Sequence, residues 1–135
     1  MADVNLLALL VATITAFVIG GVYYGLLGTR VAQLSSAAAA SGSMPPWKVL
    51  VELLRCLVLA SVVAVLVGLA DLDQWTGGLT LGAVLWVGFP LVLWTGAIIH
   101  ESTPWKLAAI HAGDWLFKLL ATGVILSGWE GAFGG

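Results

Sequence analysis

Charge is what this sequence has least of. Its 135 residues include five Lys or Arg and seven Asp or Glu, so 9% of the chain is charged and 61% is hydrophobic. Ordinary water-soluble domains carry about a quarter charged residues, so this chain has too few polar side chains to cover a water-soluble globule. The shortage excludes a soluble enzyme and a disordered chain. A net charge of −2 without a basic patch excludes a nucleic-acid partner.

Cysteine and histidine are almost as scarce. Cys56 is the single cysteine in the sequence, so no intrachain disulfide can form, and we interpret it as a small apolar packing residue. A metal site needs more clustered ligands than one Cys and two separated His residues, His100 and His111. We therefore expect no metal and no cofactor.

Long apolar stretches, by contrast, are abundant. Four stretches of 22 to 24 residues are apolar on every face rather than alternating, and about 20 helical residues cross a bilayer core. The sequence predicts an all-α polytopic membrane protein whose four transmembrane helices form a compact bundle, with residues 1–135 making a single integral membrane domain. The expected spans are Val4–Leu27, Trp47–Ala70, Gly78–Ile99 and Trp105–Gly128.

Positive charge indicates how the spans are oriented. Arg30, Lys48 and Lys106 flank the first and third loops, whereas the second loop and both ends of the chain carry only acidic residues. Lys and Arg concentrate in cytoplasmic loops, so we expect both termini outside the cell. Tryptophans at the span ends are typical membrane-interface anchors; they are Trp47, Trp75, Trp105 and Trp129.

A small set of ionisable residues falls inside the expected spans: Glu52, Arg55, His111, Asp114 and Lys118. A charge at bilayer depth costs at least about 2.5–3.5 kcal/mol on insertion scales, so each one needs a partner or a wet cavity. His111, Asp114 and Lys118 share one stripe of the fourth span because they are spaced i, i+3, i+7. At about 1.5 Å per residue, Arg55 and Asp114 come to nearly the same depth. We therefore expect Arg55 to pair with Asp114, and Glu52 to reach His111.

Two interpretations of this cluster stay open. With Tyr23 and Tyr24 it forms a candidate site in the cytoplasmic half of the bundle, where a small polar ligand binds or protons are relayed. Alternatively, the cluster including Lys118 is a structural ion-pair network that fixes the order of the helices. No catalytic residue is predicted, since no candidate nucleophile has an obvious base.

Glycine and proline mark the helix contacts. Gly21 and Gly25 form a small-xxx-small pair on the first span, and the third span is rich in glycine. Such residues allow close helix packing, either within the chain or between copies of it in a homo-oligomer. Pro90 lies inside the third span and should kink it.

Several motifs resemble a family of small bacterial membrane proteins known as DUF1761, a domain of unknown function. The similarity is clearest in the C-terminal half, through Gly88-Phe89, Pro104-Trp105-Lys106-Leu107, Ile110, Ala112-Gly113, Gly123, Ile125-Leu126 and Trp129. A looser N-terminal match comprises Asn5, Gly21, Tyr24, Leu26, Leu27 and Gly28. The resemblance implies a compact four-span protein of the bacterial inner membrane, and it carries over no functional residue.

The sequence thus predicts a small transport or ligand-binding protein that works through the polar cluster. The alternative is a non-catalytic accessory or structural subunit of a larger membrane complex, and an integral membrane enzyme is the third class. The expected partners are the lipid bilayer, further copies of the chain or a larger complex, and a small polar ligand.

Overall fold

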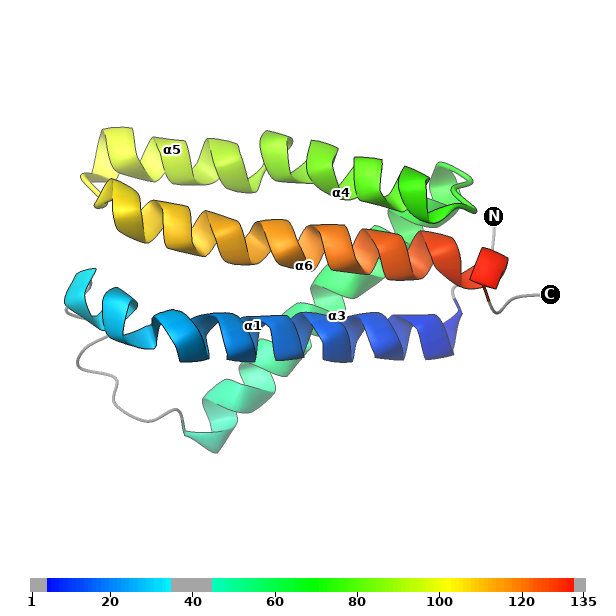
Figure 1. Cartoon of the computed structure of the whole chain (residues 1–135), viewed down its shortest axis with the longest axis horizontal. Helices are drawn as coiled ribbons and strands as arrows, with labels where there is room; N and C mark the ends of the chain where they lie inside the picture. Colours follow the sequence, from blue (N-terminus) through cyan, green and yellow to red (C-terminus); the bar gives the residue numbers. More distant parts are fainter. Residues whose placement is uncertain (1–4, 35–44, 133–135) are drawn as a thin grey trace.

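The computed structural model describes residues 5–34 and 45–132, which are helical apart from short connections (Figure 1). The helices are α1 (Leu6–Leu34), α3 (Pro46–Leu69), α4 (Trp75–Gly88), α5 (Pro90–Glu101) and α6 (Trp105–Ala132).

Four helical segments are long and apolar enough to cross a membrane. They are Leu6–Arg30, Pro46–Leu69, Trp75–Glu101 and Trp105–Trp129, where the third comprises α4 and α5 together. The prediction of an all-α fold with four transmembrane helices is confirmed. The protein is a multi-pass membrane protein.

Local sequence explains where the helices begin and break. The Asn5 side-chain oxygen accepts a hydrogen bond from the Ala8 N–H at 3.0 Å and so caps the start of α1. The third span divides at Phe89 because Pro90 has no N–H to donate to the preceding turn. Backbone bonds from Phe89 to Leu85 and from Leu93 to Phe89 continue on either side of this division. The sequence predicted a kink at Pro90, and the structure shows the span divided into two helices at this position.

The helices form one bundle around α6. In Figure 1, α1, α6 and the α4–α5 pair run alongside one another, while α3 crosses them obliquely. α6 packs against each of the other four described helices, whereas α3 packs mainly on α1 and α6. The oblique course of α3 decides which charged side chains can meet.

Glycines bring α4 and α6 into close contact. A Cβ atom added to Gly78 would lie 1.9 Å from the Gly123 carbonyl oxygen, and one added to Gly82 would lie 2.6 Å from that of Leu119. These distances are far below any real contact, so the two backbones touch where side chains would otherwise separate them. Gly78, Gly82 and Gly123 therefore serve packing within the chain.

The glycines of α1 behave differently. Nothing lies within 4 Å of a Cβ added to Gly21, Gly25 or Gly28. The contact of α1 with α3 is made instead by alanines, because Ala8, Ala12 and Ala60 belong to one buried cluster. Gly21 and Gly25 face away from the interior of the bundle.

Most of the apolar surface remains uncovered by protein. Only 17% of the most apolar window of the α3 span and 39% of that of the α6 span is buried. Large aliphatic side chains such as Leu10, Leu50 and Val84 are exposed. The lipid bilayer is therefore the environment that covers them.

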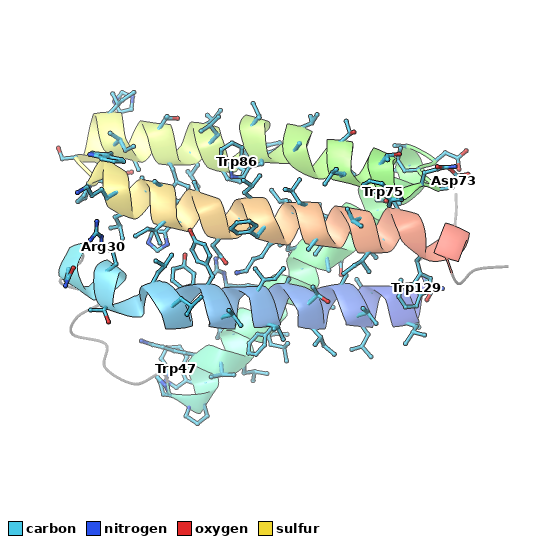
Figure 2. The ribbon with its side chains drawn as sticks, in the orientation of Figure 1. Arg30, Trp47, Asp73, Trp75, Trp86 and Trp129 are labelled. Carbon is cyan, nitrogen blue, oxygen red and sulfur yellow. The ribbon has the colours of Figure 1, made fainter. Side chains whose placement is uncertain are left out.

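The two ends of the bundle differ in charge. Figure 2 shows Arg30 at one end of the molecule, and Asp73, Trp75 and Trp129 at the other. The first turns of α3 and α6 each contain a tryptophan followed by a lysine. The lysine Nζ lies 5.6 Å from the centroid of the neighbouring indole for Lys48 and 5.8 Å for Lys106. Such pairs are suited to the membrane–water interface.

Candidate functional site

The centre of the polar cluster is a buried lysine between two carboxylates. Lys118 Nζ lies 2.8 Å from Asp114 Oδ2 and 3.4 Å from Glu52 Oε1. The side chains of Lys118 and Asp114 are only 7% and 5% exposed, whereas that of Glu52 is 28% exposed. The i, i+4 spacing on α6 brings Asp114 and Lys118 together, and the crossing of α3 adds Glu52.

Arg55 lies at the edge of this cluster. Its Nη1 atom donates a hydrogen bond to Glu52 Oε2 at 2.7 Å, one turn away on α3. The Arg55 side chain is 60% exposed. Glu52 therefore links the exposed Arg55 to the buried Lys118, with one carboxylate oxygen for each.

The expected pairing of Arg55 with Asp114 is wrong. The partner of Asp114 is Lys118, and the partner of Arg55 is Glu52. Equal depth along two parallel helices was the basis of that expectation. Because α3 crosses α6 obliquely (Figure 1), residues at equal distances along the two helices are not neighbours.

His111 also has other partners than expected. The Tyr24 hydroxyl oxygen and His111 Nδ1 lie 2.6 Å apart, within hydrogen-bond distance. The imidazole stacks on Trp94 of α5 with the ring centroids 4.9 Å apart. Glu52, which was expected to reach His111, contacts Lys118 instead. His111 thus connects α1, α6 and α5.

Tyr23 lies beside this group and binds backbone. Its hydroxyl donates to the Ile110 carbonyl at 2.6 Å, and its ring meets that of Tyr24 edge to face with centroids 5.4 Å apart. The structure therefore divides the predicted site residues into two adjoining groups. The first, called here the charged cluster, is Glu52, Arg55, Asp114 and Lys118. The second, called the aromatic cluster, is Tyr23, Tyr24 and His111 together with Trp94, which was not predicted.

Two glycines make room for these side chains. A Cβ on Gly20 would lie 3.0 Å from Lys118 Nζ, and a Cβ on Gly113 would lie 2.4 Å from the Tyr23 hydroxyl oxygen. Sequence reasoning gave neither glycine a part in the site, and it missed Trp94. An aromatic residue inside an apolar run resembles ordinary packing, so nothing in the sequence marks Trp94.

Charge within the cluster balances only when Arg55 is counted. If ionised, Glu52, Asp114 and Lys118 sum to −1, and Arg55 brings the sum to zero. The second carboxylate oxygen of Asp114, Oδ1, is buried and accepts no hydrogen bond from any residue of the described ranges. A buried acceptor of this kind costs free energy unless something donates to it.

Within residues 5–34 and 45–132, no three His, Cys, Asp or Glu residues are grouped so as to hold a metal ion. Cys56 is buried on α3, four residues after Glu52.

Comparison with known proteins places the chain in a family. It matches the family described as "Protein of unknown function (DUF1761)" over residues 7–127. No curated protein and no solved structure matches it. The matched region contains all four membrane-spanning helices almost completely, together with both clusters. The chain belongs to the DUF1761 family of proteins of unknown function.

Proposed function

We propose that this protein is a small transport or ligand-binding protein whose ligand is a proton, taken up and released by the charged cluster. The observation that carries the proposal is Asp114 Oδ1, which is buried beside Lys118 and accepts no hydrogen bond from a described residue. A proton on this oxygen would leave Glu52 and Lys118 as a neutral pair beside Asp114, with Arg55 at the exposed edge of the cluster. Intramembrane carboxylates and basic groups arranged in this way form the proton relays of pumps and transporters.

The aromatic cluster supports access to Asp114 from one side of the membrane. His111 precedes Asp114 by three residues on α6, and Tyr24 lies against its Nδ1 atom. Each imidazole ring nitrogen donates or accepts a hydrogen bond, depending on the tautomer. His111 and Tyr24 thus offer exchangeable protons between Asp114 and the Trp105 end of α6. We propose that this end faces the cytoplasm, because Arg30, Lys48 and Lys106 lie near it.

Proton movement can be measured directly. The purified protein is reconstituted into vesicles containing a pH-sensitive dye, and a potassium diffusion potential is imposed with valinomycin. We expect wild-type vesicles to change internal pH faster than protein-free vesicles. Asp114→Asn should remove most of this excess rate because an amide cannot exchange the proton.

The matched control is Asp73→Asn, which makes the same chemical change on the exposed turn before α4. It should leave the rate unchanged. A folded Asp114→Asn protein with wild-type proton movement would contradict the proposal. So would a wild-type protein no faster than empty vesicles.

The second candidate function is that of an accessory or structural subunit in a larger membrane complex. The contact between Glu52 of α3 and Lys118 of α6 favours it, because this ion pair fixes one helix against another. Under this alternative, replacing Asp114 lowers the free energy of unfolding of the protein and leaves the rate of proton movement across the vesicle membrane unchanged. The same vesicle experiment, combined with an unfolding measurement, separates the two.

Location and assembly complete the proposal. We propose that the chain forms a single domain in the inner membrane of a bacterium, with both termini outside. The glycines of α1 that face away from the bundle, Gly21 and Gly25, support self-association because small residues let helices approach closely.

A further inference from the structure

An apolar groove separates α3 from the third span. It is lined by residues of α3 including Leu59, Val62 and Leu66, by residues around the α4–α5 break, and by Trp115 and Leu119 of α6. Its volume is about 710 Å³, which lies within the range of about 300–1,000 Å³ for small-molecule sites. The oblique course of α3 (Figure 1) opens this groove.

The lining excludes a polar solute. The described lining residues are aliphatic, aromatic, glycine or proline, and none of them carries a charge or a hydroxyl. An apolar chain is the kind of group that such a surface accommodates. In a membrane, acyl chains are the apolar groups present in greatest supply.

Arg55 adds a charge at one end of the same surface. It shares a face of α3 with Leu59, Val62 and Leu66, because the spacing is i, i+4, i+7, i+11. Its side chain is 60% exposed, and a single hydrogen bond to Glu52 occupies one of its five N–H donors. A guanidinium with free donors binds phosphate well.

An exposed arginine in a membrane-spanning helix requires an explanation. Arg55 is nine residues from the first residue of α3, Pro46, which is about 13 Å along the helix. The oblique course of α3 makes its depth smaller than this length, and the flexible stem of an arginine reaches toward the interface. The phosphate of a lipid headgroup at the membrane interface can therefore contact the Arg55 guanidinium.

We infer that the groove between α3 and α4–α5 binds one anionic phospholipid, with an acyl chain in the groove and the phosphate on Arg55. Opposite charge and the apolar lining select this occupant over a zwitterionic lipid or a second protein chain. The site shares Arg55 with the charged cluster and does not include the buried pair of Asp114 and Lys118.

The experiment compares two lipids that differ in headgroup charge. The full-length protein in detergent is titrated with phosphatidylglycerol or with phosphatidylcholine of identical acyl chains, and bound lipid is counted by native mass spectrometry. We expect tighter binding of phosphatidylglycerol. Arg55→Gln should weaken it about tenfold, the effect of losing a charge-assisted hydrogen bond, and remove most of the preference for phosphatidylglycerol over phosphatidylcholine. Arg30→Gln, at the end of α1, is the matched control and should have no effect.

A second variant tests the groove itself. Gly88 lines the groove, and a Cβ added there meets nothing within 4 Å. Gly88→Leu should therefore fill the groove without disturbing the fold, and weaken the binding of both lipids. Gly96→Leu is its control, because Gly96 also has open space at Cβ and does not line the groove.

Three results would overturn the inference. Equal affinity for the two lipids in the wild type would remove the role of charge. Unchanged phosphatidylglycerol binding in Arg55→Gln would remove the role of Arg55. A dimer of the wild type that Gly88→Leu dissociates would make a second copy of the chain the occupant.

Discussion

At the scale of single residues, Lys118 is the most consequential side chain. It is buried at 7% exposure and satisfies one oxygen of Asp114 and one of Glu52. Removing one member of a buried pair leaves an uncompensated charge, which costs much more than the pair contributes. The same residue therefore controls both the stability of the bundle and the charge that surrounds Asp114.

We expect Lys118→Met to lower the free energy of unfolding by about 3–5 kcal/mol. The double variant Lys118→Met with Asp114→Leu should regain most of this loss, because no charge of the pair remains unpaired. The free energies of unfolding of the single and the double variant are measured in mixed micelles. Lys48→Met is the control and should change little, since Lys48 lies at the start of α3 beside Trp47. Losses that simply add in the double variant would show that the two residues do not interact.

The composition of the charged cluster was predictable, and its pairing was not. The residue list follows from position, because any charge inside a long apolar run must be accommodated. The ion-pair partners depend on the angle between α3 and α6. Residue spacing within one helix gives no information about this angle. Glu52 is six residues after the start of α3 and Lys118 is thirteen residues after the start of α6. Parallel helices would separate them by about 10 Å along the axis, whereas in the structure Lys118 Nζ and Glu52 Oε1 lie 3.4 Å apart.

At the scale of helices, glycine has two different uses. Gly78 and Gly123 allow α4 and α6 to touch, whereas Gly21 and Gly25 of α1 have nothing within 4 Å of an added Cβ. The small-xxx-small spacing is the same in both kinds of surface. Sequence alone could not tell which glycines face the chain and which face the membrane, since that depends on helix rotation.

Substitution by alanine should separate these two uses. Gly78→Ala would place a methyl group 1.9 Å from the Gly123 carbonyl oxygen, so we expect the free energy of unfolding to fall by about 1–3 kcal/mol or more. Gly25→Ala should be neutral or stabilising, because it meets no atom and alanine favours helix. Thermal unfolding of the two variants in one detergent provides the comparison. Equal shifts would contradict the packing described for α4 and α6.

The limits of the four spans and the break at Pro90 were readable in the sequence because they depend on length, hydropathy and a missing backbone donor. Each observed span limit lies within three residues of the expected one. The oblique crossing of α3 was not readable. It depends on the fit between Ala8 and Ala12 of α1 and Ala60 of α3, which is a property of two helices together.

At the scale of the whole molecule, the unequal charge of the two ends is the feature that bears on orientation. Arg30 lies at the opposite end from Asp73 (Figure 2). Lys48 and Lys106 lie in the first turns of α3 and α6, at the end where α5 finishes with Glu101. The proposed orientation with the positive end in the cytoplasm follows from the bias of Lys and Arg toward that side.

Cysteine labelling tests this orientation. In a Cys56→Ala background, Asp73→Cys should react with a membrane-impermeant maleimide on intact cells. Glu101→Cys should react only after the cells are permeabilised. Both positions are exposed, so accessibility within the protein does not bias the comparison. The reverse pattern would show that the termini lie in the cytoplasm.

The central place of α6 has a consequence for biogenesis. During synthesis α6 leaves the ribosome after every helix it packs against, because it follows them all in the chain. Until it enters the membrane, Glu52 lacks its contact with Lys118, and Gly78 of α4 lacks its contact with the Gly123 carbonyl. The first three spans are therefore held by lipid and by the contacts of α1 with α3. Assembly of the bundle is completed only when the fourth span enters the membrane. Quality control in the cell can therefore act on an intermediate that has three inserted spans and lacks α6.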